Sequence, residues 1–192
     1  MVAVGDDAAM ASFFEAITTE QRALIEEAPV FFVATADPRS RPGPDGQGTV
    51  NVSPKGGSPP IVLDDRTLAW LDYAGSGDET ARHVAAGSEL TLMVMSTSAQ
   101  DAAIVRLYGR AVVQPVGFSP HAERLIAASG MRTLVRPRQV FVLHVASTMT
   151  SCGYGVPVLE ELGQRRRDGK GRRYKPPLRQ PAPAAGPPGP PG

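Results

Sequence analysis

Short blocks of apolar residues separated by turn-forming residues recur along most of this chain, and this pattern is typical of a mainly β protein. The blocks are rich in β-branched and aromatic residues and are bounded by proline, glycine and acidic residues, which predicts strands. Several short strands without an internal repeat indicate a barrel or a sandwich. The predicted strands cover residues 30–36, 49–53, 61–63, 67–73, 90–96, 103–113 and 140–146.

The amino-terminal segment has helical spacing instead. Between residues 8 and 28 the apolar side chains recur at intervals that fit one or two short amphipathic helices. Thr18 or Thr19 is a suitable cap for the second of them, because a threonine hydroxyl can accept a hydrogen bond from the first turn. Pro29 ends this segment.

Two further helices interrupt the strands. Ser76 and Glu79 have the spacing of a capping box and predict a helix over residues 78–86. Ser119, followed by a proline at the first helical position, predicts another helix over residues 120–128. The sequence therefore predicts a mainly β domain with a few peripheral helices.

Composition divides the chain into a body and a tail. The 192 residues include 20 glycines and 19 prolines, and 13 of these fall within residues 165–192. The same tail has eight basic residues and one acidic residue, a net charge of +7, which leaves −6 for the rest of the chain. We expect a folded domain over residues 8–164 and a disordered or polyproline-like tail. A solvated extension is favoured over a nucleic-acid or anionic-membrane arm, because the tail has only Tyr174 to stack on bases.

Several function classes are disfavoured by the sequence. Cys152 is the single cysteine, which excludes an internal disulfide and a zinc site built from several cysteines. His83, His121 and His144 lack metal-ligand spacing, so we expect no metal site. The sequence also lacks a membrane-length apolar run, a secretory leader, a nucleophile elbow, a Walker loop and a Rossmann fingerprint. We therefore expect a soluble cytoplasmic protein.

The first candidate site is segment 50–57, VNVSPKGG, in which a strand is expected to run out into a proline and glycine turn. Ser53 and Lys55 stand two residues apart and can point to the same face. A hydroxyl, an ammonium group and glycine amides at a strand end form a suitable anion site. The alternative is an ordinary solvated turn.

The second candidate site is segment 75–80, GSGDET, between a predicted strand and a predicted helix. The backbone amides at the start of that helix could receive a phosphate. Asp78 and Glu79 already place negative charge at the positive end of the helix, so a plain capping box is the alternative.

Two other segments carry candidate residues. Alternation over residues 104–111 places Arg106, Tyr108 and Arg110 on one strand face. Such a face is most commonly solvated, and otherwise lines an interface or a ligand groove. Tyr154 lies in a glycine-rich segment, SCGYGVP, which permits the backbone angles that binding loops require.

Taken in order, a set of six segments between Phe31 and Pro157 resembles the pyridoxamine 5′-phosphate oxidase-like family of FMN-binding split β-barrels. The segments are FFVATAD, VNVSPKG, DDRTLAWLDYAGSGDETARHV, ELTLMVM, IVRLYGRAVV and SCGYGVP. The resemblance implies a small antiparallel barrel, a mainly β fold with a few peripheral helices. It also implies a homodimer that holds FMN in a groove between its subunits.

The resemblance further implies which residues contact the cofactor. The phosphate-side lysine of the family corresponds to Lys55, and Arg106 could assist from a neighbouring strand. The founding oxidases carry basic residues at the helix start, where this chain has Asp78 and Glu79, so Lys55, Ser53 and backbone amides would neutralise the phosphate. The full set of cofactor contacts implied by position is Val50, Asn51, Val52, Ser53, Lys55, Tyr73, Ala74, Asp78, Glu79, Thr80 and Arg106.

The end of the chain departs from the true pyridoxamine phosphate oxidases. Nothing after Val140 reproduces the arginine-, histidine- and tryptophan-bearing segment that binds the vitamer phosphate in those enzymes. The sequence therefore favours an FMN-dependent oxidoreductase with an unassigned small-molecule substrate and hydride transfer at the flavin ring. Tyr154 and Arg106 are the candidates for catalytic assistance. A deazaflavin-dependent reductase and a non-catalytic flavin-binding dimer are the alternatives.

Overall fold

The computed structural model describes residues 11–37, 39, 49–74, 77–129 and 136–163 of the chain. The chain separates into two units, Met1–Leu162 and Gly163–Gly192. The fold below is that of the first unit. The predicted tail, residues 165–192, lies outside the described residues.

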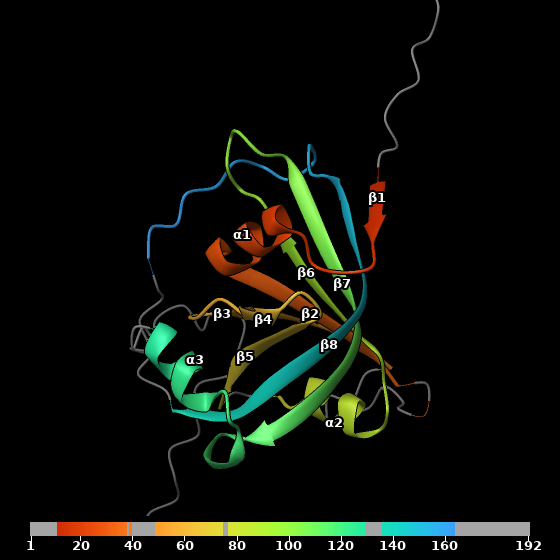
Figure 1. The fold of residues 1–192 in the computed structure, drawn as a ribbon, viewed down its shortest axis with the longest axis vertical. Helices are drawn as coiled ribbons and strands as arrows, with labels where there is room; N and C mark the ends of the chain where they lie inside the picture. The colour runs from red at the N-terminus through yellow and green to blue at the C-terminus, as the bar shows by residue number, and fades with distance from the viewer. Residues whose placement is uncertain (1–10, 38, 40–48, 75–76, 130–135, 164–192) are drawn as a thin grey trace, which may run out of the picture. The chain divides into compact units, whose positions relative to one another are not determined.

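An eight-stranded antiparallel sheet forms the body of the first unit (Figure 1). Its strands follow the order β3-β2-β6-β7-β8-β5-β4, and β1 pairs with β8 beside this path. Strand and turn signals are local, so most predicted strands are found, and the mainly β prediction is confirmed. The strands are β1 (Ala11–Phe14), β2 (Val30–Ala36), β3 (Val50–Gly56), β4 (Ile61–Asp64), β5 (Thr67–Tyr73), β6 (Leu90–Met95), β7 (Ala103–Pro115) and β8 (Pro137–Cys152).

The two longest strands, β7 and β8, run side by side through the sheet (Figure 1). The sequence predicts only residues 140–146 for the last strand, whereas β8 spans Pro137–Cys152. Its outer half is rich in serine and threonine and is held as a strand by pairing with β7 and β1. The β7–β8 register shifts between Tyr108 and Gly109, and a Cβ on Gly109 would overlap the carbonyl oxygen of His144. Only glycine therefore fits this bulge without backbone movement.

The amino-terminal segment contains one strand and one helix, where the sequence predicts one or two helices. Thr18 caps α1 (Thr19–Glu27) in a capping box with Gln21. The prediction of helix before this point is wrong, because β1 (Ala11–Phe14) pairs with the outer half of β8. Its two adjacent phenylalanines fit either a helix or a strand, and the unpaired edge of β8 decides for the strand.

Both other helices start later than the sequence predicts. The N-cap of α2 (Glu79–Ala85) is Asp78, without a side-chain cap, so a capping box that starts at Ser76 is wrong; Ser76 itself lies outside the described residues. α3 (Ala122–Ala128) follows a short 3₁₀ turn, Val116–Phe118, and its N-cap is His121 rather than Ser119. The Ser119 hydroxyl accepts from the His121 backbone amide, and the Ser119 carbonyl accepts from the Ala122 amide. These contacts form a turn that precedes the helix.

The core lies on the inner face of the sheet and centres on the only tryptophan of the sequence. Trp70 is fully buried; its ring stacks on Phe141 at 5.0 Å and meets the edge of Phe31 at 5.9 Å. Such aromatic pairs contribute about 0.5–1.5 kcal/mol each beyond the area they bury. α1 adds the fully buried Ile25 to this core. Since Phe141 also lines a cavity beside β3 and the end of β5, the packing of the core fixes one side of this cavity.

None of the helices within the described residues has the length and apolar content needed to cross a membrane.

Candidate functional site

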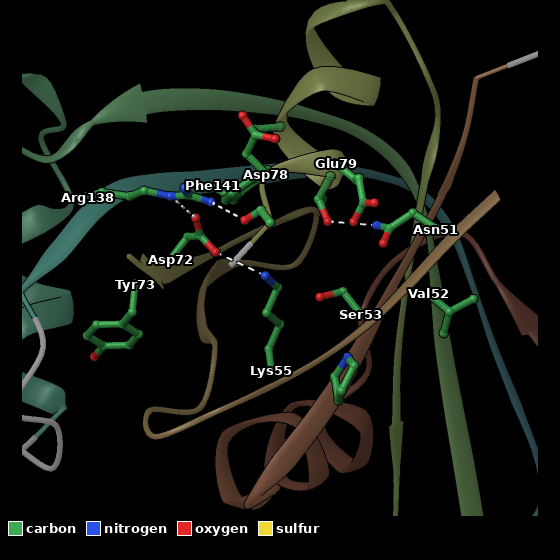
Figure 2. Close-up of a pocket in the computed structure, with 14 residues that line it drawn as sticks. Asn51, Val52, Ser53, Lys55, Asp72, Tyr73, Asp78, Glu79, Arg138 and Phe141 are labelled. Carbon is green, nitrogen blue, oxygen red and sulfur yellow. Dashed lines mark hydrogen bonds and ion pairs between the residues drawn. The ribbon is translucent and has the colours of Figure 1, made fainter. Parts of the chain in front are cut away.

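A cavity of about 350 Å³ opens where β3, the end of β5, the start of α2 and the start of β8 meet (Figure 2). This volume is at the small end of the range of ligand pockets. Most of its lining residues are polar or charged. Its lining residues are Asn51, Val52, Ser53, Pro54, Lys55, Asp72, Tyr73, Gly77, Asp78, Glu79, Thr80, Ala81, Arg138 and Phe141.

Strand β3 supplies one wall through simple alternation. Asn51, Ser53 and Lys55 lie on its less exposed face, whereas Val50 and Val52 are exposed. The expectation that the strand ends in a turn at Pro54 is wrong. β3 continues to Gly56 by pairing with β2, and the left-handed residue is Gly57, at φ 87°. Lys55 is therefore held on a strand rather than on a loop.

A buried carboxylate organises the positive groups of the cavity. Asp72, whose side chain is 4% exposed, accepts from Lys55 Nζ at 3.0 Å and from Arg138 Nε at 2.8 Å. Gln139 Nε2 donates to the same carboxylate at 2.8 Å, and Arg138 Nη2 donates to the Gly77 carbonyl at 2.9 Å. Figure 2 shows Lys55 and Arg138 converging on Asp72 from two sides. The two cations are thereby held in fixed positions at the cavity wall.

These contacts also set the ionisation of Asp72. Burial by itself raises the pKa of a carboxyl group. The Coulombic attraction of Lys55, together with hydrogen bonds from Arg138, Lys55 and Gln139, outweighs burial and lowers the pKa of Asp72 below its ordinary value. Asp72 is therefore a carboxylate at neutral pH.

The negative charge at the start of α2 is partly neutralised by nearby basic side chains. Asp78 pairs with Arg82 at 2.8 Å, one turn further along the helix. Arg138 adds a second cation to the Lys55 side of the cavity, so the positive charge there does not depend on Lys55, Ser53 and backbone amides alone. The cavity can therefore accept an anionic group beside Lys55 and Arg138 despite Asp78 and Glu79.

Arg138 and Asp72 are the charged cavity residues that the sequence reasoning missed. The vitamer-phosphate segment of the true oxidases was compared only with residues after Val140, and Arg138 lies just before it. Antiparallel pairing of β5 with β8, in which Asp72 faces Gln139, brings the two residues together. The run of polar residues that opens β8, RPRQ, is the one signal in the sequence that could have pointed to this site.

The family assignment follows from comparison of the whole chain with known proteins. The family model described as pyridoxamine 5′-phosphate oxidase matches residues 17–152. The chain belongs to the pyridoxamine 5′-phosphate oxidase family. It is 33% identical over 153 residues to the pyridoxamine 5′-phosphate oxidase family protein ustO of Aspergillus flavus. That alignment covers 79% of this chain but 58% of ustO, so the chain spans less than two thirds of this relative's length.

Solved structures share the fold of this family member. HupZ of Group A Streptococcus matches with a TM-score of 0.51 and 22% identity, over 67% of this chain and 89% of HupZ. An FMN-binding protein of Syntrophomonas wolfei matches with a TM-score of 0.51 and 13% identity, over 67% of this chain and 82% of that protein. A candidate pyridoxamine 5′-phosphate oxidase of Lactobacillus delbrueckii matches with a TM-score of 0.50 and 22% identity, over 70% of this chain and 93% of that protein. The predicted split-barrel fold of the family is confirmed.

Most of the residues that the family resemblance implies as cofactor contacts line the cavity of this family member. Three of the implied residues lie elsewhere. Val50 is 67% exposed on the far face of β3, Ala74 is exposed after β5, and Arg106 lies on β7 with its Nη1 3.2 Å from the Ser151 hydroxyl. The residues that do line the cavity are Asn51, Val52, Ser53, Lys55, Tyr73, Asp78, Glu79 and Thr80.

The catalytic candidates Tyr154 and Arg106 do not meet within this single chain. Tyr154 is 88% exposed beside a second cavity of about 250 Å³, formed by the loop after β6 and the segment that follows β8. Arg106 lines neither cavity. Ser151 and Cys152, expected after the last strand, form the end of β8.

Arg106 belongs instead to the outer face of the sheet, the face opposite the core. One cross-strand row on this face places Arg106 between two methionines, Met93 and Met149, and continues to Phe32 and the 71% exposed Phe13. The sequence favours a solvated surface for the strand face that contains Arg106. The row is mostly apolar and fits an interface better.

Proposed function

We propose that this protein is an FMN-dependent oxidoreductase that acts on a small molecule other than pyridoxamine phosphate. The observation that carries the proposal is the pair of cations, Lys55 and Arg138, tethered by Asp72 at the wall of the cavity. Phosphate groups are bound by such pairs of cations. Among structures with this fold, the Syntrophomonas wolfei protein is described as FMN-binding.

The residues present fit FMN by their donor set. Lys55 and Arg138 would hold the phosphate, because Lys55 has N–H groups beyond the one used on Asp72, and the guanidinium of Arg138 has more donors than its two contacts need. Burial raises the pKa of Tyr73, so its phenol stays protonated at neutral pH. When bound, FMN would supply hydride transfer at its ring.

The flavin content of the purified protein tests this proposal first. We expect a yellow protein that releases FMN on denaturation, identified by chromatography and mass spectrometry. A colourless protein that takes up neither added FMN nor a deazaflavin coenzyme would refute the proposal. Uptake of the deazaflavin alone would support the deazaflavin-dependent alternative.

The phosphate assignment is tested by paired titrations with FMN and riboflavin, which differ only by the phosphate group. Lys55→Ala and Arg138→Ala should each lower the affinity for FMN about tenfold or more, because each removes a charge-assisted hydrogen bond worth about 1.5–3 kcal/mol. The affinity for riboflavin should be nearly unchanged. Arg110→Ala, which removes an exposed arginine on β7 outside the cavity, is the matched control. Equal losses for the two ligands would assign Lys55 and Arg138 a structural role.

We further propose that the protein is a homodimer that associates through the outer face of the sheet. The support is the apolar row that includes Phe32, Met93 and Met149, which a single chain leaves partly exposed. Burial of this face between two copies would remove apolar surface from water. It would also bring Arg106 under the cover of a second subunit.

A further inference from the structure

Four polar side chains form a hydrogen-bonded chain from His83 on α2 to the wall of the cavity that contains Lys55. His83 is 3% exposed, and its Nδ1 lies 3.0 Å from the Thr35 hydroxyl. Asn51 Nδ2 donates to that same hydroxyl at 3.4 Å and to the Thr80 hydroxyl at 2.9 Å. Asn51 and Thr80 line the cavity, whereas Thr35 and His83 do not. The buried histidine is thus connected to the cavity through hydrogen bonds.

The direction of these hydrogen bonds can be followed from group to group. Each threonine hydroxyl has a single hydrogen, and Asn51 Nδ2 has two, one for each hydroxyl oxygen. Because the Thr35 oxygen accepts from Asn51, its own hydrogen is available for His83 Nδ1. Likewise, because the Thr80 oxygen accepts from Asn51, its hydrogen remains available to a ligand in the cavity.

The opposite direction would give the cavity the opposite character. If His83 Nδ1 carried a hydrogen, it would donate to Thr35, and the Thr35 hydrogen would turn towards an Asn51 amide rotated by half a turn. Thr80 would then donate to the Asn51 carbonyl and present a lone pair to the cavity. The Thr35 oxygen has two lone pairs, so the hydrogen on Nδ1 and the orientation of the Asn51 amide together decide whether Thr80 is a donor or an acceptor for the ligand.

We propose that His83 is a positioning residue that keeps the Thr80 hydroxyl as a donor to the phosphate of the bound cofactor. It does so with its ring hydrogen on Nε2, so that Nδ1 accepts from the Thr35 hydroxyl. This inference rests on the proposed function, since it takes an anionic group in the cavity as the acceptor. The other three members of the hydrogen-bonded chain, Thr35, Thr80 and His83, are each at most 5% exposed. Water therefore cannot easily replace a hydrogen-bond partner that a substitution removes.

Three variants separate a positioning role from simple packing. His83→Leu and Thr35→Val each remove one link with little change in volume, and we expect both to weaken FMN about tenfold and riboflavin less than about twofold. His83→Asn should restore most of the FMN affinity, because the asparagine side-chain oxygen can accept from Thr35 where Nδ1 does. His144→Leu, at an exposed position on β8, is the matched control and should change neither affinity. Equal weakening of FMN and riboflavin, or no rescue by asparagine, would overturn the proposal.

A second measurement does not require a ligand and therefore distinguishes failure of this inference from failure of the proposed function. Two-bond ¹H–¹⁵N correlation spectra of the full chain report which imidazole nitrogen carries a hydrogen. The sequence has three histidines, so the His83 signals are assigned by their loss in His83→Asn. A neutral ring protonated at Nε2 supports the proposal, and a hydrogen on Nδ1 overturns it even if FMN binds. If FMN does not bind the wild-type protein, the flavin proposal fails, and these spectra still decide the hydrogen-bond direction.

Discussion

Replacement of Asp72 with asparagine is expected to lower the free energy of unfolding by about 3 kcal/mol. Hydrogen bonds to charged groups contribute about 1.5–3 kcal/mol and neutral ones about 0.5–1.5 kcal/mol. The single amide oxygen of asparagine can keep the bonds from Arg138 and Gln139 at neutral strength, a cost of about 1 kcal/mol each, and the bond from Lys55 to the other oxygen is lost, at about 1.5 kcal/mol. The side chains of Lys55 and Arg138 are 21% and 32% exposed and can turn partly to water. Their hydration keeps the total below the upper range for a broken buried ion pair, about 5 kcal/mol.

The assay for this prediction is urea unfolding of the flavin-free protein, followed by the fluorescence of Trp70 at a fixed protein concentration. Trp70 is the single tryptophan of the sequence and is buried against Phe141, so its emission reports on the core. The corresponding drop in thermal midpoint is about 9 °C for a domain of this size. Asp65→Asn, at an exposed carboxylate in the turn after β4, is the control and should cost less than about 0.5 kcal/mol.

The pH dependence provides the sharper test of the reasoning. Because the pKa of Asp72 is lowered on folding, its ionisation stabilises the folded protein above the unfolded pKa of about 3.9. That contribution is lost as the pH falls through the folded pKa. The stability difference between wild type and Asp72→Asn should therefore be constant near neutral pH and shrink below about pH 4. A difference under about 1 kcal/mol at pH 7, or one that persists at low pH, would refute the assigned role of Asp72.

Three further predictions concern the fold and its assembly. Gly109→Ala should cost about 3 kcal/mol or more by urea unfolding, because its Cβ would overlap a backbone oxygen, whereas Gly117→Ala, whose Cβ meets nothing within 4 Å, should cost under about 1 kcal/mol; similar losses would argue against the bulge. Met93→Asp should convert the proposed dimer to a monomer by light scattering, and Phe118→Asp, at an 85% exposed site off the outer face, should not; an unchanged mass for Met93→Asp would place the interface elsewhere. Removal of residues 165–192 should leave the thermal midpoint and flavin affinity unchanged, and unfolding of the shortened chain would show that the domain boundary is misplaced.

Sequence reasoning succeeds where the structural signal is local. The bounds of β2 and β5 match their predictions, because each is a β-rich run closed by a proline or by turn residues. The cap of α1 at Thr18 is also one of the two residues predicted. Sequence reasoning fails for β1 and for the outer half of β8, because their residues become strands by pairing with each other and with β7.

The candidate site divides in the same way. Alternation along one strand was enough to predict that Ser53 and Lys55 share a face, because side-chain direction repeats every two residues. No local pattern identified Asp72 or Arg138, which contact each other across 66 positions of sequence. Their contact depends on the register between β5 and β8, including the irregularity after Asp72.

By itself, the sequence determined the mainly β fold, the family resemblance and the strand that forms one wall of the cavity, because these depend on residues near one another in the chain. The tertiary structure decided which charged groups share a site and how they are held. It placed Lys55 and Arg138 on one carboxylate, connected His83 to Thr80, and moved Arg106 to the outer face of the sheet. The physical reason is that Coulombic and hydrogen-bond energies fall steeply with distance, and strand register sets those distances.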